Sequence, residues 1–199
     1  MTHVAKLSFG SVVLGVCLSL SVVAHAEATT FKVQGSKAKF ISDAPLETME
    51  GTTNKVSGML TVDPSDISKT TGKFKVPVKS LDTDNDLRDE HLQGDGWLDA
   101  KKSPFLHFEI TEVVLGKKSS TELKQGKETK VQVKGNFTAH GITKPIIANG
   151  KVKWSGNEIR VKADFPVVLT DHDISVPSIV RLKVANEIAV SVDLRGVAK

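Results

Sequence analysis

Apolar and polar residues alternate along most of this chain. Between Lys73 and Lys79, a lysine or a proline separates each apolar residue from the next, so that Phe74, Val76 and Val78 fall on one face. A period of two is typical of a β-strand with one buried side. The pattern therefore predicts a strand whose inward face carries these three side chains.

The same period recurs in seven other segments. The apolar faces that it predicts are, in chain order, Ala38 and Phe40; Val56, Leu60 and Val62; Leu106, Phe108 and Ile110; Val131, Val133, Phe137 and Ala139; Ala148, Val152 and Trp154; Ile159, Val161, Ala163 and Phe165; and Ile188, Val190, Val192 and Leu194. The first of these segments shows the weakest pattern. Turn-forming clusters, such as residues 63–66 and 155–157, separate the segments. Strands of this kind predict an all-β domain, either a barrel or a sandwich, and the period does not choose between the two.

One segment breaks the alternation, between Asp84 and Leu98, where a few apolar residues stand amid charged ones. It predicts a short helix that Asp84 or Asp86 caps at its start and that Gly94 and Gly96 interrupt. A second, shorter helical turn is expected at residues 65–68.

The first residues resemble a secretory signal. Lys6 precedes an uncharged run over residues 7–23, and the run ends in a small-x-small cleavage pattern, Ala24-His25-Ala26. The apolar core is short for a membrane span, and no stop-transfer pattern follows. We expect residues 1–26 to be removed and residues 27–199 to form one periplasmic domain that does not span the membrane. Cys17 leaves with the signal, so the domain is expected to fold without disulfides.

The formal net charge of the chain is +4, but its lysines are spread along the sequence. Nucleic-acid-binding proteins usually concentrate basic residues on one face, so we expect no nucleic-acid partner. The outward lysines of the predicted strands fit two roles, contact with an anionic surface or simple solvation of the strands. These lysines are Lys73, Lys75, Lys79, Lys151 and Lys153.

Residues that carry chemistry are sparse. The chain lacks a Gly-x-Ser-x-Gly elbow, a phosphate-binding loop and a His-Glu-x-x-His motif. His107 and Glu109 share the face opposite the apolar one, and the Asp171-His172-Asp173 run is expected in a loop. We therefore predict neither a catalytic site, nor a metal site, nor a cofactor.

Two other histidines have two interpretations each. His91, beside the charged residues Arg88, Asp89 and Glu90, suits either a polar head group or acid–base chemistry, or else a capped and ion-paired helix that closes the barrel. His140 precedes Gly141 and is expected to order a turn rather than to perform chemistry.

Four blocks of sequence together resemble the YceI-like family. They are the run LDTDNDLRDEHL at residues 81–92, Trp97-Leu98-Asp99, SPFLHF at residues 103–108, and GNFTAHGITKP at residues 135–145. Their order and spacing match that family over nearly all of residues 27–199. The chain departs from the family pattern in its first strand, which lacks a Trp and an Asp-x-x-His-Ser block, and around residues 169–177, where it carries a proline-containing variant.

The resemblance implies an eight-stranded, lipocalin-like antiparallel barrel in the periplasm. It also implies that the lumen binds an isoprenoid chain, a polyprenyl or quinone tail, and that the protein is a possible homodimer. An eight-stranded barrel is just wide enough for its side chains to fill it or for one small ligand. The residues expected to line the lumen are Phe40, Phe74, Val76, Trp97, Phe108, Phe137, Trp154 and Phe165. In the alternative interpretation these residues fill the core, and the barrel acts without a ligand in envelope interactions or a stress response.

Overall fold

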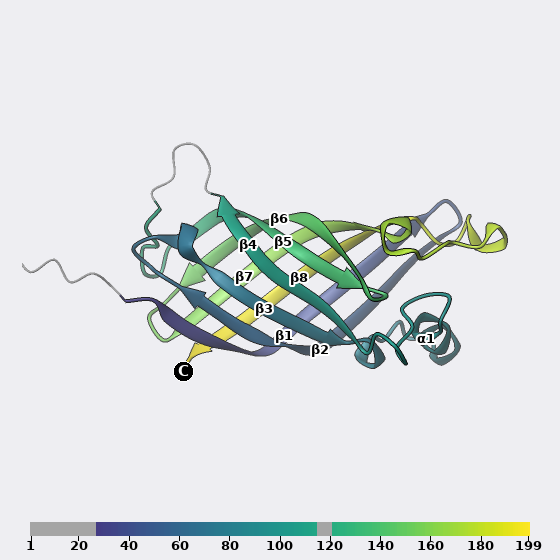
Figure 1. Cartoon of the computed structure of the whole chain (residues 1–199), viewed down its shortest axis with the longest axis horizontal. Helices are drawn as coiled ribbons and strands as arrows, with labels where there is room; N and C mark the ends of the chain where they lie inside the picture. Colours follow the sequence, from purple (N-terminus) through teal and green to yellow (C-terminus); the bar gives the residue numbers. More distant parts are fainter. Residues whose placement is uncertain (1–26, 115–120) are drawn as a thin grey trace, which may run out of the picture.

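A computed structural model describes residues 27–114 and 121–199, so the expected signal segment lies outside the described residues. Eight antiparallel strands form a closed barrel in which each strand pairs with its neighbours in sequence (Figure 1). The last strand pairs with the first, which leaves the sheet without an open edge. The strands are β1 (Thr29–Ala44), β2 (Glu47–Val62), β3 (Thr71–Pro77), β4 (Phe105–Val114), β5 (Glu128–Ala139), β6 (Ile142–Trp154), β7 (Glu158–Val168) and β8 (Glu187–Ala198). The prediction of an eight-stranded antiparallel barrel is confirmed.

The weak first segment is in fact a 16-residue strand, and β-bulges explain why its period was hard to see. The register between β1 and β2 shifts on both sides of Ser36. Before the shift the buried residues are Phe31 and Val33, at odd positions, whereas after it they are Ser36 and Ser42, at even positions. An extra residue in a strand reverses the faces of all the residues that follow.

Val78 corrects the expectation for the third strand. The strand β3 ends at Pro77, and Val78 begins a 3-10 turn, Val78–Ser80. The Val78 side chain is nevertheless fully buried. Its amide donates to the carbonyl of Pro104 at 3.0 Å, so the turn is tied to the segment that enters β4.

One end of the barrel is closed by packed side chains. Phe31, Val62 and Ile159 are each at most 2% exposed there. A short 3-10 turn, Ile67–Lys69, lies at this end, and Asp66 is its N-cap. It coincides closely with the turn expected at residues 65–68. The Ile67 amide donates to the carbonyl of Thr121 at 2.8 Å, so the turn is tied to the segment that precedes β5. This end of the lumen is a conventional hydrophobic core.

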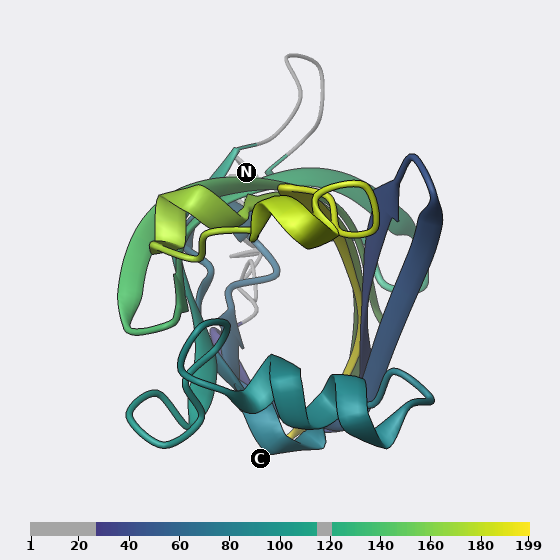
Figure 2. The ribbon, with the colours of Figure 1, turned by 90° about the vertical axis from the view of Figure 1, so that its right-hand side faces the viewer.

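The other end is framed by two short segments on opposite sides of the barrel opening (Figure 2). One is helix α1 (Asp86–Gln93), for which Asn85, rather than either expected aspartate, is the N-cap and accepts from the Arg88 amide at 3.0 Å. The other contains two 3-10 turns, Leu169–His172 and Ser178–Val180, between β7 and β8. We call this opening the mouth.

The outer face carries pairs of opposite charge on neighbouring strands. Lys73 on β3 lies 2.8 Å from Glu109 on β4, and Arg160 on β7 lies 2.6 Å from Asp193 on β8. Each exposed pair of this kind contributes little to stability, but together the charged residues keep the outer surface of the barrel hydrated. Within the described ranges, no helix has the length and apolarity needed to cross a membrane.

Replacement of Phe31 tests the packed end. Phe31→Ala should lower the free energy of unfolding by about 3–5 kcal/mol, because it opens a cavity among side chains that cannot collapse. Phe105→Ala is the matched control, since Phe105 is only half-buried on the outer face under the Lys75 ammonium. Phe105→Ala should lower the free energy of unfolding by about 1 kcal/mol. Urea denaturation measures both values, and equal losses would contradict a packed end at Phe31.

Candidate functional site

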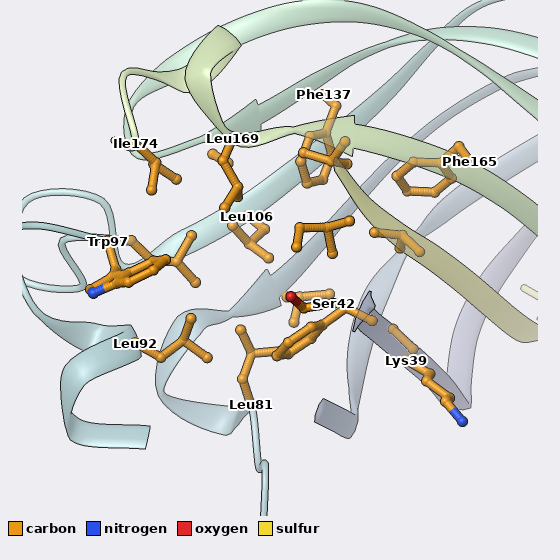
Figure 3. A pocket seen from close by; sticks show the side chains of 18 of the residues that line it. Lys39, Ser42, Leu81, Leu92, Trp97, Leu106, Phe137, Phe165, Leu169 and Ile174 are labelled. Carbon is orange, nitrogen blue, oxygen red and sulfur yellow. The ribbon is translucent and has the colours of Figure 1, made fainter. Parts of the chain in front are cut away.

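The half of the lumen that faces the mouth is hollow. It is an apolar cavity of about 580 Å³, a size typical of small-molecule sites. Every strand contributes to its wall, through Phe40, Leu60, Phe74, Phe108, Phe137, Ala148, Phe165 and Val190 among others. Most of the labelled side chains in Figure 3 converge on this space, whereas Lys39 points away from it. A hollow lumen is inconsistent with the alternative of a completely filled core.

The cavity has a blind end. Leu60, Val133 and Val161 belong to its wall. The next inward residues along the same strands, Val62 on β2 and Ile159 on β7, do not touch it and are part of the packed core. As far as residues 27–114 and 121–199 define it, the cavity opens at the mouth, where a ligand would enter or leave.

Glycines opposite the phenylalanines keep the lumen open. Gly51 pairs with Phe40 across β1 and β2, and a Cβ atom on Gly51 would lie 2.2 Å from the Phe40 ring. Likewise, a Cβ atom on Gly135 would lie 2.3 Å from the Phe108 ring. The two rings occupy the space that a side chain would take on the neighbouring strand. They consequently lie along the wall and leave the centre of the barrel free.

Four of the aromatic rings form a continuous series on the wall. The ring centroids are 6.4 Å apart for Phe74 and Phe108, 6.0 Å for Phe108 and Phe165, and 5.7 Å for Phe165 and Phe137. Aromatic pairs at such distances stabilise each other beyond the area that they bury. The series gives the cavity a rigid, apolar surface that spans strands β3, β4, β5 and β7.

The structure places seven of the eight expected lumen residues on the cavity wall: Phe40, Phe74, Val76, Trp97, Phe108, Phe137 and Phe165. Trp154 is the exception and corrects the expectation. It lies at the end of β6, next to the β6–β7 turn, where its indole Nε1 donates to the carbonyl of Gly156 at 2.7 Å. A period of two identifies the inward face of a strand but not the depth along the barrel axis.

Sequence reasoning missed the contribution of the segment between β7 and β8. Leu169 and Ile174 are buried and line the cavity (Figure 3). Val184 also borders it. The expectation treated this segment only as a family variant. Its apolar residues have no strand or helix period, so no periodic signal marked them as part of the wall.

Charged residues of the α1 side are used to hold the helix in place. Arg88 donates from Nη2 to the carbonyl of Thr83 at 2.8 Å, and its Nη1 lies 3.2 Å from a Glu47 carboxylate oxygen. Asp89 accepts from the amide and the hydroxyl of Thr83 at 3.0 and 2.5 Å. The arrangement matches the interpretation of a capped, ion-paired helix. His91 borders the cavity with an exposed side chain.

Asp99 secures the segment that follows α1 and carries Trp97. Its amide donates to the carbonyl of Gly94 at 2.8 Å, and its own carbonyl accepts from Ser103 at 2.7 Å. Burial raises the pKa of Asp99, but hydrogen bonds from Lys102, together with the charges of Lys102 and His140, outweigh burial and hold this pKa below its ordinary value. The carboxylate is therefore ionised whenever the segment is folded at neutral pH.

Two histidines fasten the opposite side of the mouth. His172 is 1% exposed, and its Nδ1 lies 2.9 Å from the carbonyl oxygen of Ile142. The Nδ1 of His140 lies 3.1 Å from the carbonyl oxygen of His172. Because a carbonyl only accepts, each Nδ1 must carry the proton that it donates. Both rings order the backbone here, as expected for His140 at its turn.

The remaining candidates for chemistry stay apart. His107 and Glu109 are exposed on the outer face of β4, and His172 points away from Asp171 and Asp173, which are exposed. Across residues 27–114 and 121–199, no three His, Cys, Asp or Glu side chains come close enough to hold a metal ion. The geometry supports binding by an apolar surface.

Comparisons with known proteins agree with this architecture. A family model described as the YceI-like domain matches residues 25–196. A UPF0312 protein of Vibrio cholerae is 28% identical over 180 residues, which cover 86% of this chain and 90% of that protein. The crystal structure of BcnA from Burkholderia cenocepacia is similar with a TM-score of 0.68 at 19% identity, covering 80% of this chain and 95% of that one.

A second solved structure is similar to the same extent. It is a polyisoprenoid binding domain from Saccharophagus degradans implicated in plant cell wall breakdown, with a TM-score of 0.68, 15% identity, and coverage of 87% of this chain and 100% of that one. At such identities the two structures establish the shared barrel fold.

Gly51→Ala tests how the lumen is kept open. The added methyl group should push the Phe40 ring off the wall and into the cavity, weakening the binding of an apolar fluorescent dye by about 1 kcal/mol, or about fivefold. Gly96→Ala is the matched control, because a Cβ atom there would meet nothing within 4 Å. Dye titration measures both, and unchanged affinity in Gly51→Ala would contradict this role of glycine.

The anchoring role of Asp99 predicts a pH dependence. A carboxyl group whose pKa is lowered by folding stabilises the folded state above its unfolded pKa of about 3.9, and this contribution disappears as the pH falls through the folded value. In a Trp154→Phe background, Trp97 is the only tryptophan, and its fluorescence should change as the pH drops below about 4. Asp99→Asn should remove this change in fluorescence. If the variant shows the same change at the same pH, the change comes from another titrating group.

Proposed function

Since the chain belongs to the family of YceI-like domains, we propose that it binds one long isoprenoid chain, such as a polyprenyl or quinone tail, inside its barrel. The observation that carries this proposal is the blind-ended, apolar cavity of about 580 Å³. A polar substrate would lose its hydration there without gaining hydrogen bonds. An elongated hydrocarbon has no polar groups whose hydration would be lost, and its shape fits a space that is open at one end.

The energetics favour a long tail. Burial of each CH₂ group contributes about 0.8 kcal/mol, so several isoprene units suffice for tight binding without a charged anchor. Polar side chains that border the cavity are found at its mouth, among them Asn85, Arg88 and His91. A head group would rest beside them while the tail occupies the blind end.

The comparison with the Saccharophagus degradans protein supports the ligand class. That structure is described as a polyisoprenoid binding domain, and it shares the barrel over its whole length. The hollow lumen of this chain favours the same mode of binding over a ligand-free structural role. We accordingly assign the protein a binding function rather than a catalytic one.

An exported location suits this function. Residues 1–26 have the pattern of a cleaved secretory signal, and the rest of the chain contains no cysteine. The proposed site of action is therefore the periplasm, where a carrier would shield an isoprenoid chain from water between membranes.

Filling the cavity tests the proposal. Ala163 is buried and lines the cavity, so Ala163→Trp should occupy the space of the tail and abolish binding. Ala189→Trp is the matched control, because Ala189 is exposed on the outside of β8. Native mass spectrometry, after incubation with a long-chain quinone or a polyprenol, should show one bound lipid in the unmodified protein and in Ala189→Trp only.

Circular dichroism must show that Ala163→Trp remains folded. The proposal fails if the unmodified protein yields no lipid on organic extraction and also takes up neither added quinone nor polyprenol. Binding that persists in folded Ala163→Trp would place the lipid outside the lumen.

A further inference from the structure

Exposed apolar side chains gather at the mouth. Large hydrophobic residues are exposed at six described positions, and four of these border the mouth: Leu46, Leu87, Ile179 and Leu182. Ile179 is 90% exposed and Leu46 is 69% exposed. Single exposed hydrophobic residues are ordinary, but a cluster around one opening marks an interaction surface.

The charged residues differ between the two sides of the mouth. Residues 174–186 include Arg181 and Lys183 and no acidic residue, and the exposed residues Asp171, Asp173 and Glu187 flank this stretch. Both basic side chains are exposed, and neither takes part in any ion pair found among the described residues. The opposite side, at α1, exposes the acidic residues Asp84, Asp86, Glu90 and Asp95.

The stretch of residues 174–186 on the side opposite α1 has a fixed shape. We define the lip as five exposed residues on this side, Leu46 from the β1–β2 turn together with Ile179, Arg181, Leu182 and Lys183. The Leu46 amide donates to the carbonyl of Leu182 at 2.9 Å, which joins the two parts of the lip. The Ala185 amide donates to the buried hydroxyl of Ser42 at 2.9 Å and ties the lip to β1. The apolar exposure is thus part of the folded structure.

The lip is also part of the entrance. Ile179 and Lys183 both border the cavity, so any ligand that passes the mouth moves along them. In Figure 2 the segment that carries them crosses one side of the opening, opposite α1.

We propose that the lip docks on an anionic lipid bilayer, with Leu46, Ile179 and Leu182 entering the interface and Arg181 and Lys183 beside the lipid head groups. Apolar side chains flanked by basic residues are the combination that binds such surfaces. The acidic α1 side would be repelled, so the barrel should stand tilted, with the mouth open toward the lipid along one side. Docking is independent of a bound ligand, and only its purpose, transfer of an isoprenoid chain, rests on the proposed function.

A second copy of the chain fits the lip less well. In a twofold dimer formed through the lip, the same patch meets itself, which brings Arg181 and Lys183 of both copies into one interface. Anionic head groups neutralise these cations instead. Charge complementarity therefore favours the bilayer.

Vesicle flotation tests the proposal with the full mature chain. Vesicles of phosphatidylcholine and phosphatidylglycerol should carry the protein, and binding should fall with added salt and with phosphatidylcholine alone. Ile179→Ser with Leu182→Ser should weaken binding about tenfold or more, because two apolar side chains no longer enter the interface. Ile147→Ser with Val197→Ser is the matched control, since these two exposed residues lie on the outer faces of β6 and β8, and it should leave binding unchanged.

Other results would overturn the proposal. These are absence of binding by the unmodified protein, equal losses in the two double variants, or binding that does not depend on phosphatidylglycerol. Sedimentation that shows a dimer broken by the lip substitutions, without vesicle binding, would assign the lip to a second copy.

Native mass spectrometry with a detergent-solubilised quinone separates this inference from the proposed function. Both double variants should keep the quinone in the barrel. Vesicle binding by a protein that takes up no isoprenoid would leave the docking inference standing and defeat the proposed function alone.

Discussion

Closure of the sheet is the constraint on which the rest of this structure depends. Pairing of β1 with β8 removes both edges, so each of the eight strands pairs with a neighbouring strand on both sides. Closure at eight strands also sets the width of the lumen, which is just large enough for side chains or for one slender ligand. What distinguishes this protein is how the side chains divide that fixed space.

The lumen is divided along its length. At one end Phe31, Val62 and Ile159 pack together and stabilise the barrel, while beyond Leu60 and Val161 the centre is empty. An empty apolar space costs stability, since its wall lacks contacts on one side. The packed end offsets this cost, and rings placed over glycines such as Gly51 and Gly135 make the wall dense even where the centre is hollow.

Charged residues have different roles on the two sides of the mouth. On the α1 side, Arg88, Asp89 and Glu47 engage one another or Thr83, so their charge positions a helix. On the opposite side, backbone hydrogen bonds and His172 hold the segment between β7 and β8. Arg181 and Lys183 form no ion pair with the described residues. A charge that the fold does not use remains available to a partner, and the cavity opens beside it.

By itself, the sequence determined the strands, the inward face of most of them, the helix near Asp84 and the resemblance to the family, because alternation and short motifs are local properties of the chain. It also identified seven residues of the cavity wall, from Phe40 to Phe165. Only the tertiary structure decided how deep each inward residue lies, which separated Trp154 from the wall, and where the bulges around Ser36 reverse the faces of β1. Depth, and the hollow itself, depend on register between strands and on glycines lying opposite rings, and these relations join residues that no local pattern connects.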